Sequence, residues 1–233
     1  MTWVKICGTT NLEDALTAVE AGADAVGFVF YEKSPRNISV EAARAIVEKL
    51  PESVEKVGVF VGEMAETVRE ITEKAKLTIA QTYPDFRNPL SIPDDRFFER
   101  ALSRLIVALP ASQLGREESD DPDVITGFRV SDRFRDRVAA VLLDSGTSGR
   151  PGGTGKKFDW ESVVSMTDLV GRIGLRLIVA GGLTPGSVED AMRALTPWGV
   201  DVVSGVEARP GKKDPEKVRA FVKAVRDADR KTS

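Results

Sequence analysis

Two polar side chains stand where apolar, strand-like runs of the sequence end. Cys7 ends the run that begins at Val4, and Asp144 follows the five apolar residues 139–143. A thiol near positive charge can become a thiolate that accepts a proton, and a carboxyl group in apolar surroundings can keep a proton for donation. The pair therefore indicates general base and general acid chemistry. The alternatives are a small buried hydrophobe for Cys7 and a cap or loop anchor for Asp144.

The composition narrows the possible chemistry. The 233 residues include no histidine and a single cysteine. This excludes a serine-histidine triad, a histidine-ligated metal, an internal disulfide framework and a multi-cysteine zinc site. Proton transfer must use Cys, Asp, Glu, Lys or Tyr.

Three glycine-rich segments, at 152–156, 180–182 and 204–206, follow the last three strand-like runs. Glycine lets backbone N–H groups approach an anion closely, and three such segments at one corner favour phosphate binding over plain turns. The first segment is not a P-loop, because Arg150 and Lys157 occupy positions that the motif reserves for Gly and for Ser or Thr. Arg36 could hold a carboxylate or a phosphate, or be a solvated surface charge.

These residues need a scaffold that brings strand ends together. We expect strands at 4–7, 25–30, 56–61, 77–81, 104–108, 138–143, 176–180 and 200–204. Helix-like segments alternate with them, which predicts an α/β fold, a single (β/α)₈ TIM barrel over residues 1–233. An open doubly wound sheet is the alternative, but no strand is followed by G-x-G-x-x-G.

Start signals mark several of the helices. Asn11 is a candidate cap for the helix at 12–21, Ser39 for that at 40–50, and Pro185 suits a first turn before 188–195. The last helix is expected at 214–227. Segments 83–95 and 109–137 carry no such pattern, and 109–137 is expected to be partly a mobile loop.

The charge pattern bears on partners. The 33 basic and 36 acidic residues give a net charge of −3 and are spread along the chain, so we expect neither a nucleic-acid face nor a membrane anchor. No apolar run approaches the ~18–20 residues that span a bilayer, and no signal-peptide pattern is present. We expect a cytoplasmic protein with a small-molecule ligand.

Taken together, segments along nearly the whole chain resemble the phosphoribosylanthranilate isomerase family of tryptophan biosynthesis. They are residues 4–8, 23–30 with 34–36, 57–61, 142–144, 152–156 with 158–160, 180–185 and 201–214.

The resemblance implies an Amadori rearrangement of N-(5-phosphoribosyl)anthranilate on a TIM barrel, without a metal or an organic cofactor. Asp144 matches the family's general acid, Cys7 its general base, and Arg36 the residue that contacts the anthranilate moiety. The matching phosphate cradle is Gly153, Gly155, Gly181, Gly182, Ser204 and Gly205.

The chain departs from the family after the fourth strand. Where members usually carry Gln-Leu-His-Gly, this chain has Gln81-Thr82-Tyr83-Pro84. We expect Gln81 and Tyr83 to bind substrate, since a phenol can hydrogen-bond or stack on an aromatic ring. The protein could be a monomer or a homodimer. A sugar-phosphate epimerase, or a non-catalytic phosphoribosyl-ligand binder on the same barrel, remain alternatives, although metal-dependent epimerases need histidine ligands.

Overall fold

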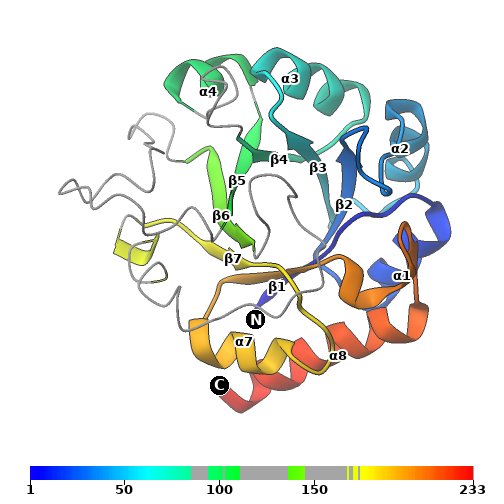
Figure 1. The fold of residues 1–233 in the computed structure, drawn as a ribbon, viewed down its shortest axis with the longest axis vertical. Coiled ribbons are helices and arrows are strands. Elements are labelled where there is room, and N and C mark those ends of the chain that lie inside the picture. The colour runs from blue at the N-terminus through cyan, green and yellow to red at the C-terminus, as the bar shows by residue number, and fades with distance from the viewer. Residues whose placement is uncertain are drawn as a thin grey trace.

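The computed structural model describes residues 1–84, 94–101, 103–110, 136–144, 167, 170–172 and 174–232. Eight parallel strands close into a barrel in chain order, with the eighth paired to the first (Figure 1). They are β1 Trp3–Ile6, β2 Ala25–Phe30, β3 Glu55–Val61, β4 Ile79–Tyr83, β5 Arg104–Pro110, β6 Val138–Asp144, β7 Leu177–Val179 and β8 Gly199–Val202. The barrel predicted from the sequence is confirmed.

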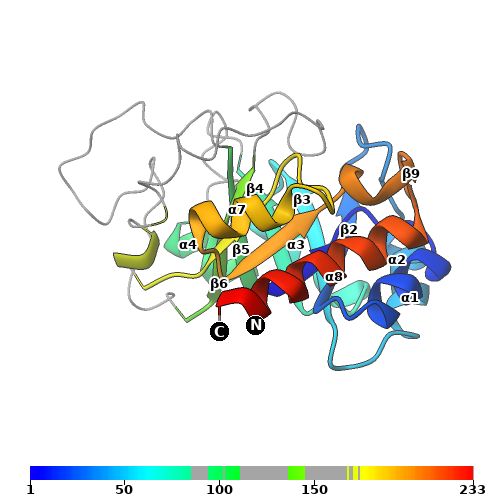
Figure 2. The same cartoon turned by 90° about the horizontal axis from the view of Figure 1, so that it is seen from below.

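Helices surround the barrel (Figure 1). They are α1 Leu12–Glu20, α2 Val40–Val47, α3 Ala65–Lys74, α4 Asp95–Ala101, α7 Val188–Leu195 and α8 Pro215–Thr232. The side chains of Asn11 and Ser39 accept hydrogen bonds from backbone N–H groups in the first turns of α1 and α2, as predicted. Figure 2 shows α8 running beside α1 and α7, with which it packs.

Side chains alternate between two apolar layers along each strand. One buried cluster draws only on strands and their ends, including Ala25, Ile79 and Leu142, and fills the barrel interior. The other joins strand residues to helix residues and lies between the barrel and its helices. The position of a residue in a strand therefore decides whether its side chain can reach the interior site.

Several boundaries differ from the prediction. Strand β4 begins and ends two residues later than expected, because the N–H of Leu77 bonds to the carbonyl of Thr72 and completes the turn after α3. Tyr83 therefore belongs to the strand. Ser204 begins a short 3₁₀ helix, Ser204–Val206, instead of ending β8, and an unforeseen hairpin follows, with β9 Glu207–Arg209 paired to β10 Lys212–Lys213.

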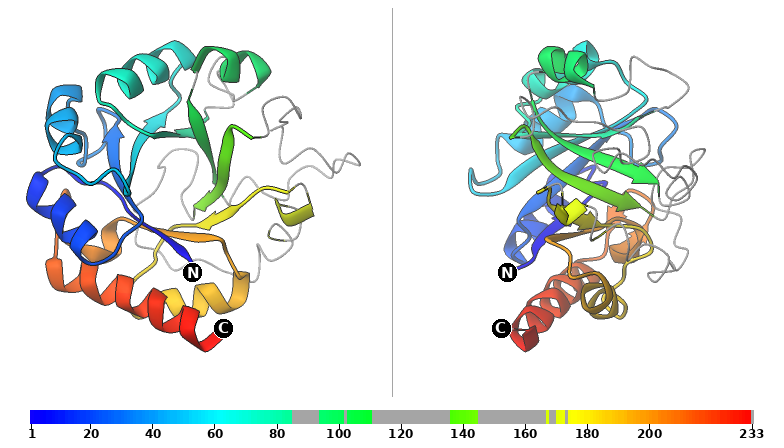
Figure 3. Two further views of the ribbon diagram at one scale, coloured as in Figure 1. Left: turned by 180° about the vertical axis from the view of Figure 1, so that it is seen from behind. Right: turned by 90° about the vertical axis from the view of Figure 1, so that its left-hand side faces the viewer.

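The segment expected to be a mobile loop, 109–137, begins with the last two residues of β5 and ends in a turn before β6; residues 111–135 lie outside the described part of the chain. The two termini lie close together (Figure 3). There, Thr2 donates hydrogen bonds from its N–H and its hydroxyl to Asp229. Among the described residues, no helix has the length and apolarity required to cross a membrane.

Candidate active site

The carboxyl ends of the strands meet at one mouth of the barrel. Cys7 directly follows β1, Tyr83 ends β4 and Asp144 ends β6. A small hollow, open to solvent, lies at this mouth and is lined by Asp144, by the end of β8 and by residues that follow β7 and β8. The lining includes four predicted phosphate-binding residues: Gly181, Gly182, Ser204 and Gly205. The structure thus places the predicted acid beside the predicted phosphate corner.

The backbone at this corner requires glycine. Gly181 and Gly182 have φ angles of 88° and 66°, a region that side chains disfavour. At Gly205, a Cβ atom would lie 1.9 Å from the carbonyl oxygen of Leu183. The chain segments after β7 and β8 can therefore pack together only with glycine at this position. Gly153 and Gly155 lie outside the described residues.

Cys7 is buried, and its backbone N–H donates to the carbonyl of Val202 on the neighbouring strand. Its thiol packs so closely on β2 that a Cβ atom at Gly27 would lie 2.6 Å from the sulfur. Burial raises the pKa of the Cys7 thiol, and the nearby ammonium groups of Lys5 and Lys213 offset this only in part. The thiolate of Cys7 is thus a stronger base than an ordinary thiolate, but the thiol is seldom ionised near neutral pH.

A buried ion pair lies beneath Cys7 inside the barrel. Lys5 and Asp201 are partners in the β1–β8 register, and Lys5 Nζ lies 3.0 Å from Asp201 Oδ1. Burial alone would lower the pKa of Lys5, but the interactions with Asp201 and Cys7 outweigh it and raise that pKa. Because Asp201 also lines the hollow, the pair connects the thiol to the mouth.

Asp144 is held by a short chain of hydrogen bonds. The hydroxyl of Tyr83 donates to Asp144 Oδ2 at 2.8 Å, and Gln81 Nε2 donates to the Tyr83 oxygen at 3.3 Å. Burial, followed by the negative charge of Asp144, raises the pKa of Tyr83 well above its usual range, so the phenol stays a donor. The structure therefore brings the residue that departs from the family pattern into contact with the predicted acid.

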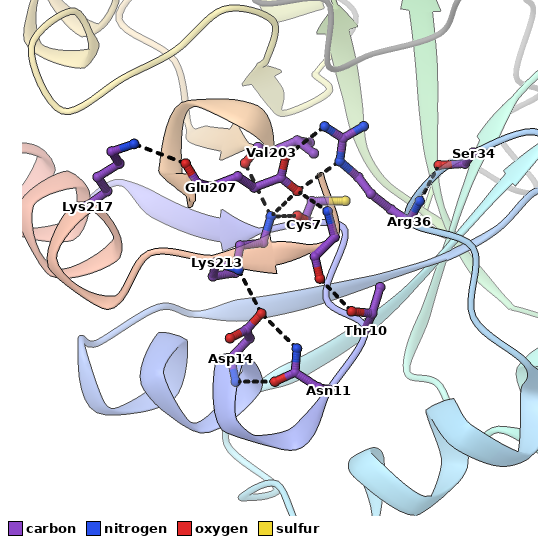
Figure 4. Close-up of polar contacts among 11 residues, drawn as sticks. Cys7, Thr10, Asn11, Asp14, Ser34, Arg36, Val203, Glu207, Lys213 and Lys217 are labelled. Carbon is purple, nitrogen blue, oxygen red and sulfur yellow. Dashed lines mark hydrogen bonds and ion pairs between the residues drawn. The ribbon is translucent and has the colours of Figure 1, made fainter. Parts of the chain in front are cut away.

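Arg36 forms a bidentate contact with the carboxylate of Glu207, a residue to which the sequence analysis assigned no role. Arg36 Nε donates to Glu207 Oε1 at 2.9 Å, and Nη2 donates to Oε2 at 2.7 Å (Figure 4). The aliphatic stem of Arg36 passes over Gly8, where a Cβ atom would lie 2.7 Å from Arg36 Cδ. This packing places Arg36 next to the segment that carries Cys7.

Lys5, Asp201, Glu207 and Lys213 are site residues that the sequence analysis missed. A charged residue inside an apolar strand is the signal for the first two, because Lys5 shares the strand face of Cys7, and Asp201 alternates with two valines. Glu207 and Lys213 carry no comparable signal, since their hairpin was not foreseen. In the part of the chain that the structure describes, no group of three or more Cys, Asp or Glu side chains could hold a metal ion.

Comparisons with known proteins point to one family. The family model described as N-(5'-phosphoribosyl)anthranilate (PRA) isomerase matches residues 4–85 and 120–224. The N-(5'-phosphoribosyl)anthranilate isomerase of Trichlorobacter lovleyi is 42% identical over 226 residues, covering 97% of this chain and 98% of the relative.

Solved structures give the same result. Phosphoribosyl anthranilate isomerase from Thermotoga maritima aligns with a TM-score of 0.78 at 37% identity, over 97% of this chain and 100% of that one. A second structure, in complex with reduced 1-(o-carboxyphenylamino)-1-deoxyribulose 5-phosphate, aligns with a TM-score of 0.71 at 35% identity and the same coverage. The chain belongs to the N-(5'-phosphoribosyl)anthranilate isomerase family.

Proposed function

We propose that Asp144 and Cys7 are the general acid and general base of the reaction this chain catalyses, the rearrangement of N-(5'-phosphoribosyl)anthranilate to 1-(2-carboxyphenylamino)-1-deoxyribulose 5-phosphate in tryptophan biosynthesis. Asp144 protonates the ring oxygen of the ribose, the C1–O bond breaks and an iminium forms. Cys7 then removes the C2 proton, and the resulting enolamine tautomerises to the ketone. Each step needs one proton donor or acceptor and no further reactant.

The position of Asp144 in the lining of the hollow carries the proposal, because the same hollow is bordered by Gly181, Gly182, Ser204 and Gly205. A phosphate held by backbone N–H groups there would fix the ribose within reach of the carboxyl group. Gly153 and Gly155 complete the proposed cradle.

Arg36, Gln81 and Tyr83 are the proposed contacts to the rest of the substrate. Arg36 would bind the anthranilate carboxylate through the nitrogen atoms that Glu207 leaves available. The bond from Tyr83 to Asp144 gives this phenol a further role, because it stabilises the carboxylate that remains once the proton has been donated. We expect the enzyme to act in the cytoplasm, as a monomer or a homodimer.

The test is the steady-state loss of substrate fluorescence, measured for the parent, Asp144→Asn and Cys7→Ser. We expect both variants to lose at least about 100-fold in kcat, the low end for removal of a general acid or base. Asp190→Asn is the control, since this carboxylate is exposed on α7 and pairs with Arg193. An active parent with an equally active Asp144→Asn would remove Asp144 from the role, and an inactive parent that still binds the reduced product analogue would favour the ligand binder.

A further inference from the structure

The carboxylate of Glu207 fixes the plane of the Arg36 guanidinium. Its two oxygens accept from Nε and Nη2, which form one edge of the guanidinium fork. Both side chains are largely withdrawn from solvent, with 13% of Arg36 and 4% of Glu207 exposed. A bidentate contact of this kind determines the direction in which the remaining N–H groups point.

Glu207 is itself held in place. Its Oε1 atom also accepts from the N–H of Gly211 and from Lys213 Nζ, each at 3.2 Å (Figure 4). Burial would raise the pKa of Glu207, but the bonds from Arg36 and the charge of Lys213 lower it overall, so the carboxylate stays ionised. The hairpin β9–β10, which carries both Glu207 and Lys213, thus acts as the support for Arg36.

The same support reaches the strand of the proposed base. Lys213 Nζ donates to the carbonyl of Cys7 at 2.6 Å and to that of Val203 at 3.2 Å. These two carbonyls and Glu207 Oε1 give the Lys213 ammonium three acceptors, one for each of its N–H groups. Arg36, Glu207 and Lys213 together carry one net positive charge, which matches a single carboxylate on a ligand.

We propose that Glu207 is a positioning residue for substrate recognition, which turns the open edge of Arg36 toward the carboxylate of the aminobenzoate ring. The inference rests on the proposed function, since it assumes that Arg36 binds this carboxylate. Glu207 acts through Arg36 and has no contact with the reacting atoms in this assignment. Lys213, by contrast, donates a hydrogen bond to the backbone carbonyl of Cys7, the proposed base.

The test uses Glu207→Gln, which keeps the shape of the side chain but replaces one acceptor oxygen by a donor. We expect KM to rise about tenfold while kcat changes less than about threefold, because one charge-assisted hydrogen bond is lost at a binding residue. Glu207→Asp, which keeps the charge, should recover part of the loss. Glu189→Gln is the control, a half-exposed carboxylate on α7 that pairs with Arg193 and Lys231 and lies outside the site.

A double-mutant cycle separates positioning from general support of the fold. If Glu207 acts through Arg36, the variant Arg36→Ala with Glu207→Gln should bind no more weakly than Arg36→Ala alone. Calorimetry with the reduced product analogue, and with the same compound lacking the ring carboxylate, gives a second readout. Glu207→Gln should weaken the first ligand about tenfold and leave the second unchanged.

The outcomes distinguish the two proposals. Additive losses in the cycle, equal weakening of both ligands, or a fall in kcat with unchanged KM would each overturn the role of Glu207 while leaving the isomerase activity of the parent intact. Failure of the proposed acid and base would show instead in Asp144→Asn and Cys7→Ser, whatever the behaviour of Glu207. Denaturant unfolding of each variant shows that the comparison is made between folded proteins.

Discussion

At the scale of single residues, the environment of Cys7 combines opposing effects. Burial disfavours the thiolate, Lys5 and Lys213 favour it, and Asp201 disfavours it; the net effect is a raised pKa. A stronger base removes a carbon-bound proton more readily but is ionised in fewer molecules. The buried Lys5–Asp201 pair beneath the thiol is thus well placed to balance the basicity of the thiolate against the fraction of molecules that carry it.

This balance predicts the titration of the thiol. The thiolate absorbance near 240 nm, taken as the difference between the parent and Cys7→Ser, should have its midpoint above the ordinary thiol value of about 8.5. Because Asp201 opposes the thiolate, Asp201→Asn should move the midpoint to lower pH. A parent midpoint below the ordinary value would mean that the two lysines outweigh burial.

Tyr83 is the second residue whose contacts predict a measurable effect. Tyr83→Phe removes the donor to Asp144 Oδ2 and keeps the ring. A hydrogen bond to a charged group contributes about 1.5–3 kcal/mol, so kcat should fall about tenfold or more, with KM nearly unchanged. Tyr83→His, the usual family residue, tests whether an imidazole can replace the phenol. A rise in KM with constant kcat would show that the hydroxyl of Tyr83 acts only in substrate binding and does not assist Asp144.

At the scale of elements, the strands and their order could be predicted because each buried parallel strand is a short apolar run bounded by helix signals. The ends were less predictable. The strand after α3 begins at Ile79 because the turn takes up Leu77, and no local pattern encodes that hydrogen bond. This shift makes Tyr83 the last residue of β4 and brings it to Asp144.

The hairpin β9–β10 shows that part of the candidate site also could not be predicted from the sequence. Cys7, Arg36, Asp144 and the glycines of the described corner could be selected from the sequence as candidates, because their types stand out at strand ends or match a family motif. The residues that hold Arg36 could not, since their role depends on a contact between segments 171 residues apart in the chain. Residue type alone gives no sign of such a partner.

At the scale of the whole molecule, catalysis and closure of the barrel occupy opposite ends. The mouth carries the proposed acid, the proposed base and the proposed phosphate corner, while the amino-terminal end is closed by aromatic and ionic contacts. Trp3 and Trp198 stack there with ring centroids 5.2 Å apart, and the Arg176 guanidinium lies 4.7 Å above the Trp198 ring. In this fold, substitutions at the amino-terminal end are expected to affect stability and leave the chemistry intact.

Arg226 on α8 offers the sharpest test of that separation. Its guanidinium donates to the carbonyls of Thr2 and Gly22 and to the carboxylate of Asp24, which fastens the last helix to the start of β1 and to the turn before β2. Arg226→Ala should lower the free energy of unfolding by about 1–2 kcal/mol, because a partly buried carbonyl and a partly buried carboxylate lose a charged donor, and should leave kcat and KM unchanged. Denaturant unfolding and steady-state kinetics measure the two effects. Arg230→Ala is the matched control, since Arg230 is exposed on the same helix and pairs with Asp227. A loss of kcat in folded Arg226→Ala would show that contacts at the amino-terminal end of the barrel affect the chemistry at its mouth.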